Sequence, residues 1–574
     1  MKKNYRVTNH KKYEHSYTLV NTVGEYLDVL ESHGESTMFV WKEKAEKKEL
    51  SFADFTAETR DFARGLGELF GTENKAETKI AVIGESSPRW FSAYLAVMAA
   101  GDTVVPMDKE LAQSEIAGFF RFAGIDAVVA APHFVKPMEE IAVGHESLGT
   151  VIPMREPDFE ANESVRRVTY DEVAAMGAES EAEFTPDADT ERVAELLFTS
   201  GTTGSSKCVM LCQRNIFSAM RAACASVDFT EDDVLISVLP LHHTYELTCT
   251  YLAGLDFGVT ICINESLRYL MRDFKEYQPT GMVVVPLFVT TMYKKVLTEA
   301  KKAGKDKILS GAIKASHALS FIGLDMSEKL FKDVRESFGG RLEKMICGGA
   351  ALNPELIPIF ESFGISIYEG YGITECSPLV SVTPYYKRKC GSVGPAVPCC
   401  EARIDGVQSD EDGHVVGEIQ VRGDNVMLGY MNNDEANETA FTDDGWYRTG
   451  DIGYMDSDGY LAITGRMKSV IVLDNGKNVF PEEIEEYLED IDLIAESVVV
   501  GREEEDGTKL VAVIYPNYAK YPDMQENDFR TEIQKQITAL NKKLPSFKQI
   551  HKLEFRKTEF EKTTTKKIKR HLVK

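Results

Sequence analysis

Residues 79–107 read KIAVIGESSPRWFSAYLAVMAAGDTVVPM, and this stretch decides the fold class. Lys79–Ile83 is a short apolar run that predicts a buried strand, and Ser87 followed by Pro88 is a typical helix start. Apolar side chains then recur at helical spacing until a glycine, after which Thr103–Pro106 predicts a second strand. This order predicts a βαβ unit, in which a right-handed crossover joins two parallel strands.

The same alternation of strand and helix signals continues along the chain. Further apolar runs predict strands, and stretches of helical character separate them. These runs are AVVAAP (127–132), ELLFTS (195–200), VLISVLP (234–240), VTICI (259–263), MVVVP (282–286) and KMICGG (344–349). We therefore expect a doubly wound α/β region over about residues 50–380.

The character of the sequence changes between about residues 391 and 465. Short alternating runs, among them GEIQVRG, MLGYMNN and GYLAITG, are broken by Gly, Asp and Asn. This pattern predicts a β-rich, barrel-like subdomain that completes a large N-terminal domain over residues 1–465.

A smaller α+β domain is predicted over residues 469–574. VIVLDNGKNVF predicts a hairpin with Asn475-Gly476 at its tip, and Pro481 followed by two glutamates opens a helix. The runs SVVVG and LVAVIYP, a helix around 526–543 and a strand near 550–556 complete this domain.

Composition excludes several classes of protein. The 574 residues exceed one compact core, and the net charge of -26 argues against a nucleic-acid partner. No apolar run approaches the length of a membrane span, and the N-terminus lacks the apolar segment of a signal peptide. The ten cysteines form no C-x-x-C motif, so we expect reduced thiols and a cytoplasmic protein.

The chain ends in a basic segment. Residues 541–574 contain 12 Lys and Arg against 3 Glu. A solvated tail is the plain interpretation. Contact with a membrane surface or with phosphates is the alternative.

The stretch TSGTTGSSK (199–207) follows a predicted strand and is rich in Gly, Ser and Thr. Glycines let backbone N–H groups turn inward, hydroxyls donate hydrogen bonds and Lys207 adds a positive charge, so an anion-binding loop is predicted. The spacing G-x-x-G-x-x-K is not that of a Walker A loop. A plain flexible loop is the alternative.

Five further motifs follow this loop in order. They are GGA (348–350), YEGYGITECS (368–377), WYRTGDIG (446–453), GRMKSVIVLDNGKNVFPEEIE (465–485) and KTTTKKIKR (562–570). With TSGTTGSSK, the set resembles the AMP-forming acyl-CoA synthetases and related adenylate-forming enzymes. The form LPLHHTYE (239–246) and the ending KIKR are most similar to long-chain fatty acyl-CoA ligases.

The resemblance implies a site that binds ATP. Tyr371 would stack on adenine, Asp451 would accept the ribose hydroxyls with Arg466 beside it, and Thr374 would bind the α-phosphate. The nucleotide-binding residues implied are Thr199, Ser200, Gly201, Thr202, Thr203, Gly204, Lys207, Gly348, Gly349, Ala350, Tyr371, Gly372, Thr374, Asp451 and Arg466.

The resemblance also assigns catalytic and conformational roles. Glu375 would ligate Mg²⁺, and His243 would lie beside the substrate carboxylate, whereas His242 has no role. Lys567 would bridge this carboxylate and the α-phosphate, with Lys566 as the alternative register. Lys468 would be the hinge, within residues 466–468, about which the C-terminal domain rotates.

The implied reaction has two steps. A fatty or other carboxylic acid and ATP give acyl-AMP and pyrophosphate, and coenzyme A then takes the acyl group. An acyl carrier protein as acceptor, a P-loop phosphotransferase and a non-catalytic nucleotide-binding relative are the alternatives. The segment MVVVPLFVTTMY (282–293) either lines the acyl pocket or forms buried core. The motifs leave the acyl chain length and the oligomeric state open.

Overall fold

The computed structural model describes most of the chain. The described residues are 19–44, 46–71, 78–199, 206–320, 324, 326–409, 413–473, 478–504, 507–562 and 568–573.

The βαβ unit predicted from residues 79–107 is present. Strand β3 (Lys79–Ile83) leads into helix α3 (Pro88–Ala99) and then into β4 (Thr103–Met107), and the two strands pair in parallel. The Ser87 hydroxyl accepts a hydrogen bond from the Trp90 backbone N–H at 3.2 Å, which caps the helix as expected.

This unit lies inside an eight-stranded sheet of the described residues, the first large sheet. Its order is β18 (Gly429–Tyr430), β9 (Lys207–Cys212), β8 (Val193–Thr199), β4, β3, β5 (Ala127–Ala130), β6 (Thr150–Pro153) and β7 (Arg166–Arg167). Its interior pairs are parallel, whereas β9 pairs antiparallel with β8 and with β18. The run MLGYMNN therefore contributes only a two-residue strand, and it joins this sheet instead of the β-rich subdomain.

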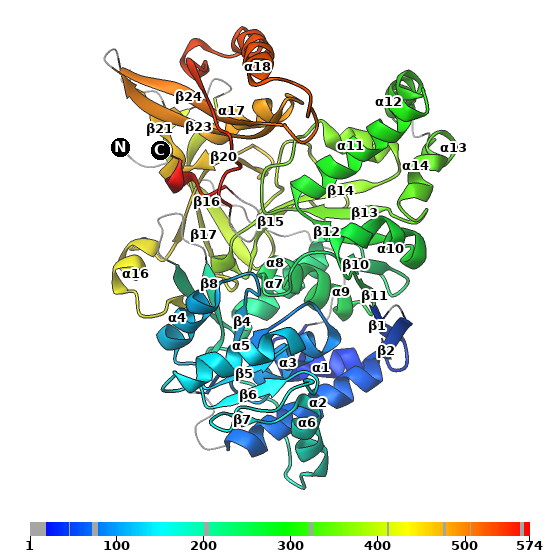
Figure 1. Cartoon of the computed structure of the whole chain (residues 1–574), viewed down its shortest axis with the longest axis vertical. Coiled ribbons are helices and arrows are strands. Elements are labelled where there is room, and N and C mark those ends of the chain that lie inside the picture. Colours follow the sequence, from blue (N-terminus) through cyan, green and yellow to red (C-terminus); the bar gives the residue numbers. More distant parts are fainter. Residues whose placement is uncertain are drawn as a thin grey trace.

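A second eight-stranded sheet of the described residues stands beside the first (Figure 1). Its order is β15 (Leu379–Val382), β14 (Ser366–Gly372), β13 (Lys344–Cys347), β12 (Gly281–Val284), β10 (Val234–Ser237), β11 (Thr260–Ile263), β1 (Thr37–Glu43) and β2 (Glu46–Ser51). Of the segment 282–293, the first residues form buried β12 and the rest open helix α11, in which Val289 and Met292 are buried and Leu287 is exposed.

Helices cover both sheets, and helix α7 lies between them. It contacts β9 of the first sheet and β15 of the second, and most of its residues are buried. The helices of the N-terminal region are α1 (Val23–Ser32), α2 (Phe52–Phe70), α3, α4 (Gln113–Ala123), α5 (Pro132–Val143), α6 (Tyr170–Glu179), α7 (Gln213–Ser226), α8 (Thr244–Glu246), a π-helix (Leu247–Leu252), α9 (Ala253–Asp256), α10 (Leu270–Tyr277), α11 (Pro286–Lys302), α12 (Asp306–Ser320), α13 (Ser327–Leu330), α14 (Lys332–Ser337), α15 (Leu356–Ser362) and α16 (Asp434–Ala440).

The remaining strands form the β-rich subdomain and the C-terminal region. The β-rich part is an antiparallel sheet of β16 (Cys400–Ser409), β17 (Val415–Gly423), β19 (Tyr447–Met455) and β20 (Leu461–Arg466). The C-terminal elements are β21 (Ile471–Val472), β22 (Asn478–Val479), α17 (Pro481–Glu489), β23 (Ile494–Glu504), β24 (Gly507–Pro516), α18 (Glu526–Asn541) and β25 (Lys552–Phe555). The hairpin, both helices and the last strand lie where the sequence predicts them. Among the described residues, no helix has the length and apolar character needed to cross a membrane.

Candidate active site

The predicted site residues gather where strands of the two large sheets end. Lys207 opens β9, the turn at Gly348 follows β13, and Tyr371 is the penultimate residue of β14. In doubly wound folds the carboxyl ends of the strands border the ligand-binding crevice. The fold therefore brings together residues that are far apart in the sequence.

Asp451 lies at the centre of one polar cluster. Its carboxylate Oδ2 accepts a hydrogen bond from the Tyr371 hydroxyl at 2.6 Å, and its Oδ1 lies 2.9 Å from Arg466 Nε. Asp451 and Arg466 are cross-strand neighbours on β19 and β20, which explains their contact. The Asp451 side chain is only 4% exposed, and each carboxylate oxygen has two lone pairs, so it retains acceptor capacity toward a ligand.

Glu375 anchors a second cluster nearby. Its Oε1 accepts a hydrogen bond from the Tyr430 hydroxyl at 2.8 Å, and the Tyr447 hydroxyl lies 3.1 Å from that of Tyr430. Lys207 Nζ sits 4.3 Å from the centre of the Tyr430 ring. Burial lowers the pKa of Lys207, the charge of Lys468 lowers it further, and Glu375 opposes both effects. The cluster thus brings the Glu375 carboxylate and the Lys207 ammonium to the same tyrosine, Tyr430.

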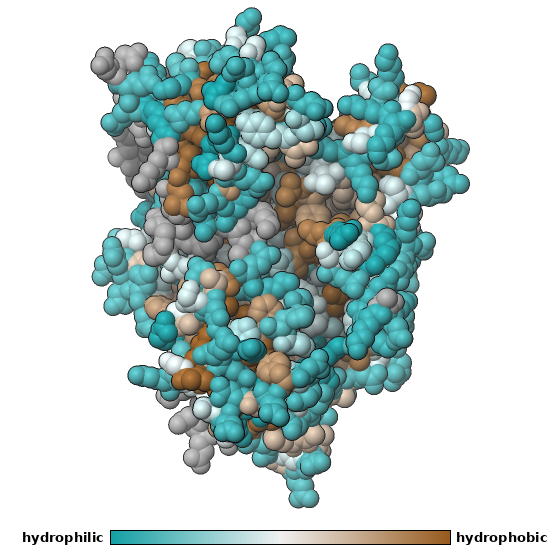
Figure 2. All heavy atoms as spheres, viewed as in Figure 1, coloured by the Kyte–Doolittle hydropathy of each residue, from teal (hydrophilic) through white to brown (hydrophobic). Residues whose placement is uncertain are grey.

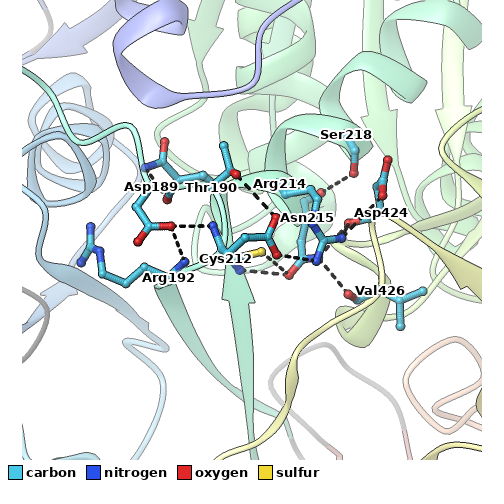
Figure 3. Close-up of polar contacts among 11 residues, drawn as sticks. Asp189, Thr190, Arg192, Cys212, Arg214, Asn215, Ser218, Asp424 and Val426 are labelled. Atoms are coloured by element: carbon cyan, nitrogen blue, oxygen red, sulfur yellow. Dashed lines mark hydrogen bonds and ion pairs between the residues drawn. The ribbon is translucent and has the colours of Figure 1, made fainter. Parts of the chain in front are cut away.

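Residues 424–431 hold this cluster in place. The Met427 backbone N–H donates to the Glu375 carbonyl at 2.9 Å, which fixes the loop that carries the carboxylate. The Asn215 side chain donates to the carbonyls of Asp424 and Val426 at 2.7 and 2.8 Å, so α7 is fastened to the same segment (Figure 3). Sequence reasoning missed Tyr430 and Asn215. The only local signal is the run MLGYMNN, which predicts a strand of the β-rich subdomain.

The glycine turn after β13 lies in a crowded place. A Cβ atom on Gly348 would come within 3.1 Å of the Gly370 carbonyl and of the Tyr245 hydroxyl. Gly349 has φ +82°, which side chains rarely adopt. The Tyr245 hydroxyl donates to the Ile346 carbonyl at 3.0 Å, which closes this side of the turn. Gly349 is therefore favoured by its backbone conformation, and Gly348 by the close approach of Gly370 and Tyr245.

An apolar cavity begins at this turn. It extends between α7, the π-helix and strands β14 and β15, and Ser226, Tyr245 and Cys249 are its polar side chains besides Tyr371. The lining residues are Ala223, Ser226, Val227, Phe229, Tyr245, Cys249, Ala253, Phe257, Ile346, Gly348, Gly349, Gly370, Tyr371, Gly372, Pro378, Leu379 and Val382. Figure 2 shows more apolar surface on the floor of a hollow between the C-terminal region and helices α11 and α12.

His243 and His242 follow β10 at the same crevice. Their rings contact at 4.1 Å between centroids. Glu246, one helical turn further, is fully buried and accepts hydrogen bonds from the hydroxyls of Ser237 and Thr250 at 2.6 and 2.9 Å. Burial raises the pKa of Glu246 to about 8. Glu246 is therefore protonated at neutral pH and serves the packing behind the cavity.

Several predicted site residues lie outside the described part of the chain. They are Ser200, Gly201, Thr202, Thr203, Gly204, Lys566 and Lys567, together with the hairpin tip at Asn475-Gly476.

The described part of the basic tail packs on the C-terminal domain. Arg570 pairs with Glu485 and lies 3.6 Å from Glu482, and Lys562 pairs with Glu496. The interpretation as a solvated tail is therefore wrong for Arg570 and Lys562, because partly buried carboxylates of this domain hold them.

The comparison with known protein families is decisive. Residues 28–431 match the family described as AMP-binding enzyme, and residues 468–574 match the C-terminal domain of AMP-binding enzymes. The chain belongs to the AMP-binding enzymes. The first match ends at residue 431, and the second begins at residue 468.

Relatives of this AMP-binding enzyme include fatty-acid ligases. A long-chain-fatty-acid–CoA ligase of Mycobacterium bovis is 30% identical over 459 residues, which cover 76% of this chain and 73% of the relative. A chloroplastic long-chain-fatty-acid–[acyl-carrier-protein] ligase of Arabidopsis thaliana is 29% identical over 541 residues, which cover 82% of this chain and 72% of the relative.

Solved structures share the fold of this AMP-binding enzyme. ATP-bound MatB from Rhodopseudomonas palustris superposes with a TM-score of 0.71 at 24% identity, covering 95% of this chain and 98% of that one. An o-succinylbenzoate CoA synthetase of Bacillus subtilis, in complex with its acyl-adenylate intermediate, superposes with a TM-score of 0.70 at 19% identity. The superposition covers 96% of this chain and 97% of that one. The predicted fold class, a large N-terminal domain with a smaller α+β C-terminal domain, is confirmed.

Proposed function

We propose that this enzyme activates a fatty acid with ATP to acyl-AMP and pyrophosphate and then transfers the acyl group to coenzyme A. One observation supports this most strongly. The apolar cavity and the polar cluster of Asp451 meet at Tyr371, which lines the cavity beside Gly348 and donates to Asp451. A molecule with an apolar chain and a carboxylate would have its carboxylate at that junction, next to bound nucleotide.

The Asp451 cluster suits a nucleoside. A carboxylate held by Tyr371 and Arg466 is fixed in orientation and has lone pairs left for the two ribose hydroxyls. The Tyr371 ring lines the cavity beside Gly348 and Gly372, where a flat base would stack against it. Thr374 and Lys207 would face the phosphates. These roles come from the family resemblance.

Glu375 fits Mg²⁺ as a single protein carboxylate. Among the described residues no group of three or more His, Cys, Asp or Glu side chains could hold a metal ion. An ion at Glu375 would take its remaining ligands from phosphates and water, which is the usual situation for Mg²⁺ in nucleotide sites. Bound there, Mg²⁺ would neutralise charge that builds up on the phosphates. Tyr430 orients the carboxylate for this task.

The acyl chain would occupy the cavity between α7 and the π-helix. Its walls are mainly Phe, Val, Leu, Ile and Ala side chains, so burial of methylene groups provides the binding energy, about 0.8 kcal/mol for each. His243 would lie on the side of the carboxylate, and Lys567 would bridge it to the α-phosphorus. No protein nucleophile is needed, because the substrate carboxylate itself attacks.

Coenzyme A is the acceptor we favour, with rotation of the C-terminal domain about Lys468 between the two steps. The Arabidopsis relative named for an acyl carrier protein motivates the second candidate, in which a carrier's phosphopantetheine takes the acyl group. A cytoplasmic location remains our proposal for the chain.

An exchange assay tests the proposed function. Labelled pyrophosphate should enter ATP only when Mg²⁺ and an acid are present, and a panel from acetate to palmitate with benzoates should show the preferred acid. Coenzyme A and an acyl carrier protein are then compared as acceptors with that acid. Failure of every acid to support exchange would contradict the proposal, and ADP as product would replace it with phosphoryl transfer.

A further inference from the structure

Asp108 and His242 meet across the crevice between the two large sheets. Asp108 follows β4 of the first sheet, and His242 follows β10 of the second. The parallel register of Val104 with Glu195 brings the carboxyl ends of β4 and β8 to the same edge, so Asp108 lies where the strand before the Gly-rich loop also ends. The pair thus links both sheets at the candidate site.

The His242 side chain is buried and its Nε2 atom is unsatisfied. Only 9% of the side chain is exposed, and Nε2 has no hydrogen-bond partner among the described residues. Burial, helped by the charge of Lys109, lowers the pKa of His242 to about 3, so the ring is neutral. A buried polar atom without a partner costs free energy, and native proteins seldom retain one without a use.

An acceptor for the His242 Nε2–H group, the Asp108 carboxylate, lies close by. Asp108 Oδ2 lies 3.5 Å from His242 Nε2, somewhat beyond a good hydrogen bond. The other oxygen, Oδ1, accepts from the Glu110 backbone N–H at 2.9 Å, which fixes the carboxylate. A shift of less than 1 Å in the His242 ring would complete the bond.

The His242 ring in turn touches His243. The two centroids are 4.1 Å apart and the planes are inclined by 52°. The His243 backbone N–H donates to the Pro240 carbonyl at 3.2 Å, so the main chain here is held. Any movement of the His242 ring toward Asp108 therefore changes the position of the His243 ring.

We propose that Asp108 and His242 are a positioning pair for His243, and that their hydrogen bond forms when the acid substrate occupies the site. This rests on the proposed function, in which His243 lies beside the substrate carboxylate. In the free enzyme the Nε2–H group of His242 is unpaired. In the occupied enzyme it donates to Asp108 Oδ2 and holds both imidazoles. An interaction that is made only in the occupied state adds to the binding free energy of the acid and so raises kcat/KM for the acid.

Three variants separate this role from packing. His242→Phe keeps a ring against His243 but removes the donor, His242→Gln keeps an N–H near the position of Nε2, and Asp108→Asn removes the acceptor charge with little change in shape. Pyrophosphate exchange is measured against acid concentration and, separately, against ATP concentration. His145→Phe, a histidine after α5 whose ring accepts from the Leu148 backbone N–H, is the matched control.

We expect His242→Phe and Asp108→Asn each to lower kcat/KM for the acid about 10- to 100-fold, the scale of one hydrogen bond to a charged group, with KM for ATP unchanged. His242→Gln and the control should stay within about 3-fold of the unmodified enzyme. The double variant Asp108→Asn/His242→Phe should be no worse than either single variant, because both remove the same bond.

Other results would overturn the proposal that Asp108 and His242 position His243. Additive losses, equal losses for His242→Gln and His242→Phe, or a parallel rise in KM for ATP would indicate packing alone. If His242→Phe does not fold, Asp108→Asn decides by itself, and normal acid kinetics in that variant would refute the proposal. Absence of exchange in the unmodified enzyme would instead refute the proposed function, and the pair with it.

Discussion

Replacing Tyr430 with Phe should weaken the response of the enzyme to Mg²⁺. The change removes the hydroxyl that donates to Glu375 Oε1 at 2.8 Å and keeps the ring on which Lys207 rests. A hydrogen bond to a charged group contributes about 1.5–3 kcal/mol. At about 1.4 kcal/mol per factor of ten, its loss corresponds to roughly 10- to 100-fold. Loss of a partner that orients a metal ligand has effects of about this size.

The assay is acid-dependent pyrophosphate exchange titrated with Mg²⁺ at saturating acid. Tyr430→Phe should need about 10- to 100-fold more Mg²⁺ for half-maximal rate, because the carboxylate must be oriented by the ion itself. Tyr447→Phe is the matched control, since the Tyr447 hydroxyl lies 3.1 Å from the Tyr430 hydroxyl and no bond joins it to Glu375. An unchanged Mg²⁺ requirement in Tyr430→Phe would refute the assignment of Glu375 as a metal ligand.

Three further predictions address other parts of the enzyme. Lys567→Ala should slow adenylation at least about 10²-fold and spare thioester formation from added acyl-AMP; equal loss in both steps, or the same effect from Lys566→Ala, would contradict the assignment. Ala253→Phe should fill part of the cavity and lower palmitate-dependent exchange at least about 10-fold relative to a short acid, whereas equal losses for all acids would exclude the cavity as the acyl site. Glu246, with its pKa raised to about 8, stays protonated when folded while the unfolded group ionises near 4.5, so it reduces folding stability progressively from about pH 4.5 to 8. In urea unfolding, the free energy of unfolding of Glu246→Gln should therefore rise relative to that of the unmodified enzyme by up to about 1.4 kcal/mol per pH unit in this range. Parallel pH profiles for the two proteins would contradict the raised pKa of Glu246.

Local signals predicted the fold because they agree with one another. In residues 79–107 the strand length, the Ser87 cap and the glycine after the helix all indicate the same βαβ unit. Gly101 has φ +86°, as a helix-ending glycine requires. The Asn-Gly hairpin and the Pro481 helix start are signals of the same local kind. Where several local signals agree, they specify the element without help from long-range packing.

Contacts between distant segments could not be predicted from the sequence. Tyr430 reaches Glu375 across 55 positions, and Asn215 binds carbonyls 209 and 211 positions away. No periodicity encodes such pairs, because they depend on how β18 pairs with β9 and on where α7 lies between the sheets. The segment 282–293 shows a related difficulty, since a continuous apolar run does not reveal where a buried strand ends and a helix begins.

The candidate site was predictable in part. The motifs named the residues that the fold gathers, among them Asp451, Arg466, Tyr371 and Glu375. The roles of these residues, of Lys468 and of the domain boundary stay predictions. The contact of His242 with Asp108 could not be predicted from the sequence. Two adjacent histidines give the same sequence signal, and only the fold shows that their environments differ.

An isotope experiment tests the central claim most directly. The enzyme converts ATP, Mg²⁺ and coenzyme A with a fatty acid whose carboxylate is labelled with ¹⁸O, and the nucleotide product is analysed by mass spectrometry. If the carboxylate attacks the α-phosphorus, one ¹⁸O remains on phosphorus when the thiol takes the acyl group. The account predicts AMP with one ¹⁸O for each acyl-CoA formed. Unlabelled AMP, or ADP with labelled phosphate, would contradict it.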